Sequence, residues 1–322
     1  MIDVIVPTFN RPTELERAVH SLFDQTIAAE GFRIIIVDNT PDHTAKLAIT
    51  ALRAACPVSI ELCVLHEPSP GVANARNKAM EHVKTELIAF LDDDQTAPND
   101  WLASLIRAHE KYPAAIVFGP VWTRLPDETI ANAAYFKQFF ARDPGLPTGF
   151  IDESFGCGNA LIERSKIPGA LPWFNTKMNE TGGEDDLLFD RVRLAGGTFA
   201  WAAEAPVWEH PPLSRVRLGY TLRRAFSFGQ GPITVARQPG NRRPLHIAAW
   251  MAIGATKAVW HLGAWVALSA IRHPSRAAQL DRAVRGIAKV FWWIEFRLYG
   301  QSALQTARDN RTTGLEQALE NS

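Results

Sequence analysis

Short apolar runs alternate with amphipathic segments along the first half of the chain. The apolar runs predict strands at 3–9, 32–40, 60–67, 87–94 and 114–121. Apolar residues three or four positions apart predict helices between them, at 11–25, 44–55, 71–83 and 99–112. Strands that alternate with helices are typical of an α/β protein. We therefore predict a doubly wound, mainly parallel sheet with helices on both faces.

The pattern changes twice in the second half. Between 122 and 155 the periodicity weakens, and prolines and glycines predict loops. Residues 182–197 then predict a helix behind two glycines, and 198–210 predict a strand. Three helical segments follow, at 218–231, 245–271 and 281–300. We predict one α/β domain over 1–213 and a basic, tryptophan-rich helical region over 214–322.

Segment 245–271 allows three interpretations. It exceeds the length of about 20 residues that crosses a bilayer, but His246, Lys257 and His261 interrupt its apolar character. Tryptophans recur in this segment and the next one, at 250, 260, 265, 292 and 293. Basic amphipathic helices that carry Trp and Phe favour the membrane interface. We expect interface association, with a membrane span or a soluble helical subdomain as alternatives.

Charge is distributed unevenly, although the formal net charge is zero. Residues 215–322 hold 16 Lys and Arg but only 5 Asp and Glu, so the remainder of the chain is acidic. This asymmetry predicts cation binding in the first part and an anionic surface as partner of the second. Nucleic acid is not expected as a partner, because no nucleic-acid-binding module accompanies the basic residues.

The cysteines and the N-terminal segment indicate the cellular compartment of the protein. Cys56, Cys63 and Cys157 show no metal-ligand spacing and no disulfide framework, which favours a reducing, cytosolic setting. The chain opens directly into a predicted strand, without the basic segment and apolar run of a signal peptide.

Three consecutive aspartates, Asp92, Asp93 and Asp94, follow the apolar run 87–91. Ligands of open α/β sheets bind outside the carboxyl ends of strands, where this cluster is expected. Adjacent carboxylates are costly unless a cation lies among them. Magnesium often uses one or two carboxylates together with substrate phosphates. The run therefore predicts a Mg²⁺ or Mn²⁺ site, with a solvated acidic turn as the alternative.

Two further residues suggest a nucleotide. Asp38 follows the apolar run 32–37, and its carboxylate can accept hydrogen bonds from a ribose hydroxyl or a base N–H. Arg76, in the predicted helix 71–83, can donate charge-assisted hydrogen bonds to a diphosphate or an acid. The alternatives are a turn aspartate and a surface arginine.

A second acidic cluster, Glu184, Asp185 and Asp186, opens a predicted helix. The helix dipole favours carboxylates at this end, which accounts for one or two of them. We predict that one carboxylate is a general base that deprotonates an attacking hydroxyl. His210 precedes two prolines and is either a metal ligand or a structural histidine.

Six motifs in this order resemble the GT-A inverting glycosyltransferases of family 2, over about residues 2–212: VIVPTFNR, IIIVDN, GVANARNKA, FLDDD, GCGNALIER and GGEDDLLF. The last of them, followed by RRAFSFGQG, is similar to bacterial exopolysaccharide glycosyltransferases of the succinoglycan-assembly type. The resemblance implies the GT-A fold.

The resemblance also implies roles for single residues. It implies a nucleotide-sugar pocket formed by Pro7, Thr8, Asp38, Arg76, Asp92 and Asp93. It implies an acceptor site at Gly158, Asn159 and Glu184, with Asp185 as the catalytic base. It implies that Asp94 and His210 hold the divalent metal, with Asp93 as the alternative principal ligand.

The implied activity is metal-dependent, inverting transfer of a sugar from a nucleotide sugar, expected to be UDP-linked. The QxxRW signature of processive synthases is absent, so we expect addition of a single sugar. The expected acceptor is a polyprenyl-diphosphate-linked glycan at the anionic cytoplasmic face of the inner membrane. A non-catalytic nucleotide-sugar sensor or scaffold on the same fold is the alternative, and a two-metal phosphodiesterase ranks last.

Overall fold

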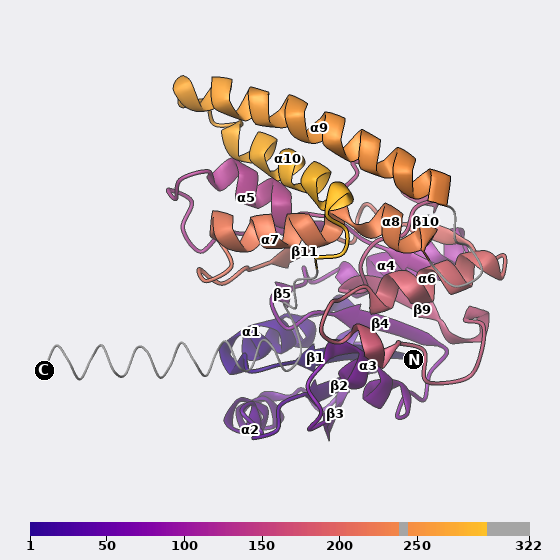
Figure 1. Cartoon of the computed structure of the whole chain (residues 1–322). Coiled ribbons are helices and arrows are strands. Elements are labelled where there is room, and N and C mark those ends of the chain that lie inside the picture. Colours follow the sequence, from indigo (N-terminus) through magenta and orange to yellow (C-terminus); the bar gives the residue numbers. More distant parts are fainter. Residues whose placement is uncertain (238–243, 295–322) are drawn as a thin grey trace, which may run out of the picture. The chain divides into compact units, whose positions relative to one another are not determined.

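The computed structural model describes residues 1–237 and 244–294, which form two compact units (Figure 1). Residues 1–122 and 141–210 belong to the first unit. Residues 123–140 belong to the second unit, together with the described residues from 211 onward. The predicted division after residue 213 had assigned 123–140 to the first domain, whereas the structure assigns that segment to the helical unit.

An eight-stranded sheet forms the centre of the first unit. Its strands are β1 (Ile2–Thr8), β2 (Phe32–Asp38), β3 (Ile60–His66), β4 (Leu87–Leu91), β6 (Ile116–Phe118), β8 (Gly149–Ile151), β9 (Asn159–Glu163) and β10 (Phe199–Trp201). Their spatial order is β3-β2-β1-β4-β9-β6-β10-β8. Strands β1 to β4 are parallel, as are β6 and β10. The predicted α/β fold with a mainly parallel sheet is confirmed.

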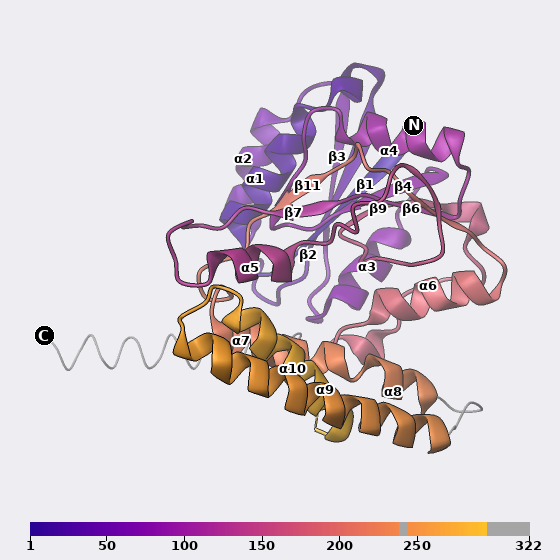
Figure 2. The ribbon, with the colours of Figure 1, turned by 90° about the horizontal axis from the view of Figure 1, so that it is seen from above.

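Helices cover both faces of this sheet (Figure 2). One face is covered by α1 (Pro12–Phe23), α2 (Lys46–Ala55) and α4 (Trp101–Lys111), and the other by α3 (Val72–Met80) and α6 (Glu184–Leu194). The apolar faces of these helices bury alternate side chains of β1 and β2 in two separate cores, because successive strand residues point to opposite sides.

Two predicted strands are each divided into two. Segment 114–121 is interrupted at Gly119-Pro120, after which β7 (Val121–Thr123) begins. Segment 198–210 contains β10 and then β11 (Val207–Glu209), which lies between β5 (Gln95–Thr96) and β7 in a separate three-stranded sheet. At Gly119 a side chain would lie 2.3 Å from the carbonyl oxygen of Ala205, so the chain can turn there only without one.

The segment expected to form loops, 122–155, contains a helix, α5 (Ala133–Phe140), and strand β8. Strand β9 was also missed, and it runs antiparallel to both of its neighbours, β4 and β6. Three short 3₁₀ segments complete the unit-1 elements: η1 (Thr26–Glu30), η2 (Arg164–Lys166) and η3 (Thr176–Met178).

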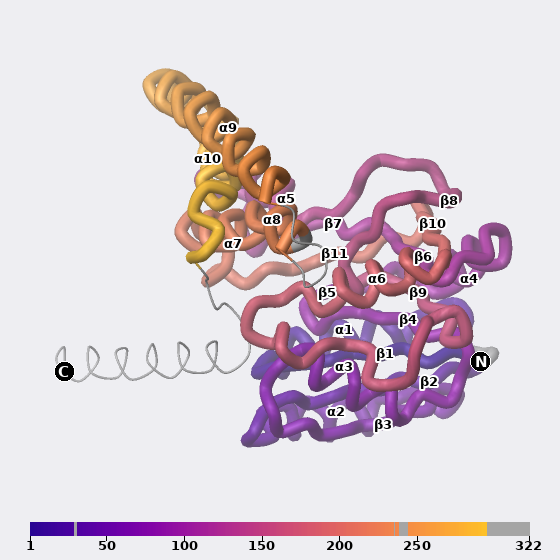
Figure 3. The backbone as a smooth tube through the Cα atoms, turned by 45° about the vertical axis from the view of Figure 1, so that its right-hand side comes forward, coloured from indigo at the N-terminus to yellow at the C-terminus, as the bar shows by residue number. Residues whose placement is uncertain are grey.

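The described residues of the second unit form four helices besides α5: α7 (Leu218–Gly229), α8 (Gly231–Ala236), α9 (Pro244–Ala270) and α10 (Arg276–Val290). Helix α10 begins before the predicted start at 281, and residues 295–300 of that predicted helix lie outside the described residues. Helices α9 and α10 lie side by side (Figure 3). They approach closely at two glycines, where a side chain on Gly254 would lie 2.6 Å from the carbonyl oxygen of Gly286.

Helix α9 is 27 residues long, yet only Gly254 and Ala258 are buried along it. Of the described residues, none form a helix that is both long and apolar enough to cross a membrane, α9 included.

A buried ion pair joins the first two strands at their shared end. The Arg33 guanidinium donates to both carboxylate oxygens of Asp3, with distances of 2.7 and 2.8 Å, and neither side chain is more than 3% exposed. The backbone amides of Lys84 and Thr85 also donate to Asp3. Burial alone would raise the pKa of Asp3, but these hydrogen bonds outweigh it and lower the pKa below its ordinary value.

We predict that Asp3→Asn destabilises the protein by about 3–5 kcal/mol at pH 7, because it leaves the Arg33 charge buried and unpaired. The contribution of Asp3 to stability is fully present above its unfolded-state pKa of about 4. It is lost as the pH falls through the lowered native pKa, so the difference between wild type and variant should shrink in acid.

Urea denaturation at pH 7 and pH 3 measures this difference. The matched control is Glu61→Gln, because Glu61 lies 3.9 Å from Arg33 but is 60% exposed, and we expect about 0.5 kcal/mol or less from it. Equal effects of the two substitutions would contradict the prediction.

Candidate functional site

Four strand ends meet at one edge of the large sheet. Thr8 and Asp38 end β1 and β2 in register with each other, and Asp92 follows the last residue of β4. Because β9 is antiparallel, its first residue, Asn159, lies opposite Leu91. The loop before β9 therefore reaches the same edge as the aspartates. Gly158 and Asp92, which are far apart in the sequence, are neighbours there.

Arg11 binds two of the three aspartates. Its Nη1 atom lies 2.8 Å from a carboxylate oxygen of Asp93 and 2.8 Å from one of Asp94. Thr8 donates its hydroxyl to Asp93 at 2.8 Å. Burial raises the pKa of Asp93 to about 6, although Arg11 opposes the shift. Arg11 is not among the predicted site residues, although it follows β1 at the edge where the aspartates were expected.

Arg76 joins the two acidic clusters. It extends from α3, is 4% exposed, and donates to Glu184 at 2.5 Å and to Asp92 at 3.4 Å. Its guanidinium also lies over the ring of Phe174, 5.6 Å from the centroid. Burial raises the pKa of Glu184 to about 7 against the opposing charge of Arg76. Arg76 thus offsets the free-energy cost of burying the Glu184 carboxylate. The Nε atom of Arg76 has no hydrogen-bond partner among the described residues.

Asp185 is held by the backbone in the first turn of α6. One carboxylate oxygen accepts the amide of Cys157 at 3.1 Å and the other accepts the amide of Asp186 at 3.0 Å. Gly182 and Gly183, with φ values of 79° and 93°, turn the chain into the helix. Asp185 remains partly exposed, so its carboxylate is fixed in place and still accessible to a substrate hydroxyl.

Gly158 allows the closest approach at this edge. A side chain there would lie 2.1 Å from a carboxylate oxygen of Asp92, so only glycine fits while Asp92 keeps its position. The neighbouring Asn159 is buried, accepts from Trp101 Nε1 at 2.8 Å, and donates to the carbonyl oxygens of Pro120 and Ala205. Asn159 therefore holds the framework of the site, and it takes no part in the mechanism proposed below.

Asp38 shapes the loop that follows β2. Its carboxylate accepts the hydroxyl of Thr40 at 2.7 Å and the amide of Ala45 at 3.4 Å. The side chain is 2% exposed. Pro7 precedes Thr8 in β1 and is partly exposed. Asp38 thus lies at the edge of the predicted nucleotide pocket and also fixes the loop beside it.

A backbone hydrogen bond places His210 beside Asp94. Its amide donates to the carbonyl oxygen of Asp94 at 2.8 Å, and its Nε2 atom lies 2.9 Å from the hydroxyl of Thr96. Within residues 1–237 and 244–294, no group of three His, Cys, Asp or Glu side chains is arranged to hold a metal ion. Asp93 and Asp94 nevertheless fit Mg²⁺ or Mn²⁺, because such ions are bound by one or two carboxylates and completed by substrate phosphates.

The family model of glycosyl transferase family 2 matches residues 3–167. The chain belongs to this family. The resemblance stated from the sequence motifs is thereby confirmed, and the protein is a glycosyltransferase.

Two curated relatives agree with this assignment. This glycosyltransferase is 31% identical to the succinoglycan biosynthesis protein ExoM of Rhizobium meliloti (strain 1021), over 77% of this chain and 79% of that protein. It is 28% identical to the pre-mycofactocin glycosyltransferase of Mycobacterium tuberculosis (strain ATCC 25618 / H37Rv), over 88% of this chain and 56% of that protein.

Solved structures share the fold. The mannosyltransferase PcManGT from Pyrobaculum calidifontis, in complex with GDP-Man and Mn²⁺, matches with a TM-score of 0.60 and 17% identity over 91% of this chain and 88% of that one. S. aureus TarS 1–349 in complex with UDP-GlcNAc matches with a TM-score of 0.51 and 13% identity over 88% and 91%. These glycosyltransferases confirm the expected GT-A fold.

We predict that Gly158→Ala raises the KM of this glycosyltransferase for its nucleotide sugar by about tenfold or more. The added methyl group displaces the Asp92 carboxylate, and the loss of one charged hydrogen bond is of this size. Steady-state kinetics and thermal melting test this. Gly149→Ala is the matched control, because a side chain there meets no atom within 4 Å and the backbone conformation is ordinary. Similar KM values for the two variants would contradict the prediction.

Proposed function

We propose that this family 2 glycosyltransferase transfers one sugar, with inversion, from a UDP-linked donor to a polyprenyl-diphosphate-linked glycan. The observation that carries the proposal is the Asp185 carboxylate, which two backbone amides hold beside the Arg76–Glu184 pair. The name of the relative ExoM, a succinoglycan biosynthesis protein, supports a polysaccharide product. The bound ligands of PcManGT and TarS support a nucleotide-sugar donor.

The proposed reaction is a single displacement. The acceptor hydroxyl oxygen forms a bond to the anomeric carbon as the bond between that carbon and the diphosphate oxygen breaks. Asp185 takes the hydroxyl proton, and the bonding electron pair leaves with the nucleoside diphosphate. Because attack occurs on the face opposite to the leaving group, one displacement inverts the configuration. A positioned base of this kind contributes about 10²–10⁴ to the rate.

Cations near the acidic edge would stabilise the leaving group. The guanidinium groups of Arg11 and Arg76 both bind aspartates of this edge. Asp94 would hold Mg²⁺ or Mn²⁺, with Asp93 as the alternative ligand and His210 as a neighbour. When bound, such an ion supplies positive charge to the diphosphate as its negative charge grows.

We also propose that helix α9 lies in the interface of an anionic membrane at the cytoplasmic face. Large apolar side chains are exposed along it: Leu245, Ile253, Val259, Trp260 and Val266. Exposed Lys257 on the same helix and Arg282 on α10 add positive charge. Each such charge contributes about 1 kcal/mol near an anionic surface, and an apolar face combined with basic residues is typical of interfacial helices.

Asp185→Asn should lower kcat by about 10²–10⁴-fold while the affinity for the nucleotide sugar changes little, because only the proton acceptor is lost. Release of nucleoside diphosphate, measured with a panel of nucleotide sugars and Mg²⁺ or Mn²⁺, gives the rate. The matched control on the same helix is Asp190→Asn, because the Asp190 side chain is 42% exposed and pairs with Arg193, which is 45% exposed.

Full activity of Asp185→Asn would refute its role as the base. Donor binding by the wild-type protein without turnover of any nucleotide sugar in the panel would instead favour the nucleotide-sugar sensor.

Val259→Glu and Trp260→Glu should each weaken binding to vesicles that contain anionic phospholipid by about tenfold or more, because each removes about 2 kcal/mol of apolar transfer free energy. Vesicle co-sedimentation of the full-length protein measures this. The matched control is Val58→Glu, a fully exposed valine of the first unit. Unchanged binding of the α9 variants would show that this helix does not contact the membrane.

A further inference from the structure

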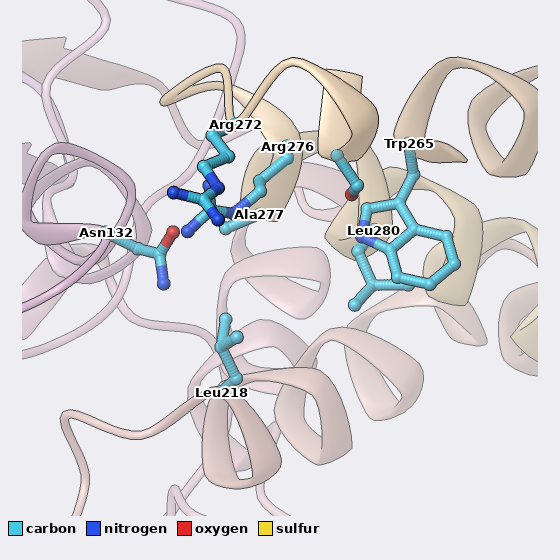
Figure 4. Close-up of a pocket in the computed structure, with 8 residues that line it drawn as sticks. Asn132, Leu218, Trp265, Arg272, Arg276, Ala277 and Leu280 are labelled. Carbon is cyan, nitrogen blue, oxygen red and sulfur yellow. The ribbon is translucent and has the colours of Figure 1, made fainter. Parts of the chain in front are cut away.

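A pocket of about 420 Å³ lies within the second unit, where α9 ends and α10 begins. Arg272 and Arg276 line it together with Asn132, and the larger apolar side chains of the lining are Leu218, Trp265 and Leu280. Figure 4 shows both arginine side chains pointing into the same space, with the Asn132 amide directed toward them from the other side. All residues that line the pocket belong to the second unit, whereas the residues of the acidic edge belong to the first.

The charges around this pocket all have the same sign. No acidic residue lines it, and neither arginine forms an ion pair within the described part of the chain. Arg276 is the first residue of α10, a helix of 15 residues with no acidic residue in its first turn and no side-chain cap at Ser275. A helix N-terminus itself carries partial positive charge. Arg272 is exposed and Arg276 partly exposed, so both guanidinium groups are accessible to an anion that would offset the repulsion between them.

The backbone at Arg272 lies in the left-handed region. Its φ is 54°, its amide donates to the carbonyl oxygen of Ser269, and the amide of His273 donates to that of Leu268. These two hydrogen bonds define the Schellman motif at the end of α9, in which glycine is the favoured residue at the position of Arg272. Strained non-glycine residues of this kind cluster at ligand sites. The chain carries an arginine here at a cost in stability, and that arginine lines the pocket.

We propose that this pocket binds a diphosphate group, carried by a prenyl lipid. Arg272, Arg276 and the Asn132 amide supply donors for the phosphate oxygens, because guanidinium groups match phosphate geometry. Trp265, Leu218 and Leu280 form an apolar wall for the hydrocarbon attached to the diphosphate. The lipid part rests on the proposed function, because the proposed acceptor belongs to this class, whereas the diphosphate site rests on the pocket alone.

The test is isothermal titration calorimetry of the full-length protein with inorganic pyrophosphate and with geranyl diphosphate. EDTA is included so that no metal assists diphosphate binding at the aspartates of the first unit. Arg276→Ala and Arg272→Gly should each weaken binding at least tenfold. Because glycine relieves the left-handed backbone, Arg272→Gly should melt at the same temperature as wild type or higher. Arg282→Ala is the matched control, since Arg282 is exposed on α10 and does not line the pocket.

The outcomes separate the two parts of the proposal. Tighter binding of geranyl diphosphate than of pyrophosphate supports the lipid source, and equal binding supports the diphosphate site but overturns its lipid source. No binding of either compound at millimolar concentration, or equal loss in Arg282→Ala and Arg272→Gly, overturns the site. Asp185→Asn should bind like the wild type, so a failure of the proposed transfer reaction would appear in the turnover assay and not in this one.

Discussion

The site requires several carboxylates to lie close together at one sheet edge, so their mutual repulsion must be offset by positive charge. Arg76 achieves most of this from inside the protein, because it bonds Glu184 of α6 and contacts Asp92 beyond β4. Arg11 does the same for Asp93 and Asp94 from the end of β1. Removing one member of a buried pair costs more than the pair contributes, since a charge is left unpaired. The same two arginines therefore determine both where the acidic residues stand and how much positive charge a diphosphate would meet there.

The strands and helices of the first half could be predicted because each carries its own periodic pattern. The apolar runs that became β1, β2 and β4 are continuous, and the aspartates after β4 mark the edge at which ligands of such sheets bind. Strand β9 was missed because its apolar run, Ala160 to Ile162, is only three residues long, and such a run also does not reveal the direction of a strand. Its antiparallel pairing with β4 is nevertheless what places Gly158 against Asp92, so the contact between the fourth and fifth site motifs could not be inferred from spacing.

Side-chain roles were harder to predict than side-chain positions. Arg76 and Asp185 were selected from the sequence for contact with substrate, and the structure shows in addition what fixes each of them inside the protein. Asn159 was selected on the same grounds, but burial and three hydrogen bonds assign it to the framework. Arg11 ends the motif VIVPTFNR but was assigned no role, because an arginine after a strand shows its function only once the fold brings Asp93 to it. A motif thus identifies residues that matter, and only their contacts show whether they serve the substrate or the protein framework.

The helical unit presents the opposite electrostatic problem. At the sheet edge, acidic groups are paired with arginines. At the start of α10, two arginines and a helix N-terminus lie together, and no acidic residue lines the pocket. A fold selected for stability alone would place glycine where Arg272 ends α9, since the left-handed backbone there disfavours any other side chain except asparagine. Helix α9 likewise exposes an apolar face that folding alone would bury. The left-handed arginine and the exposed apolar face both cost stability in the isolated protein. Both costs would be offset by a lipid environment in which phosphate groups and hydrocarbon occur together.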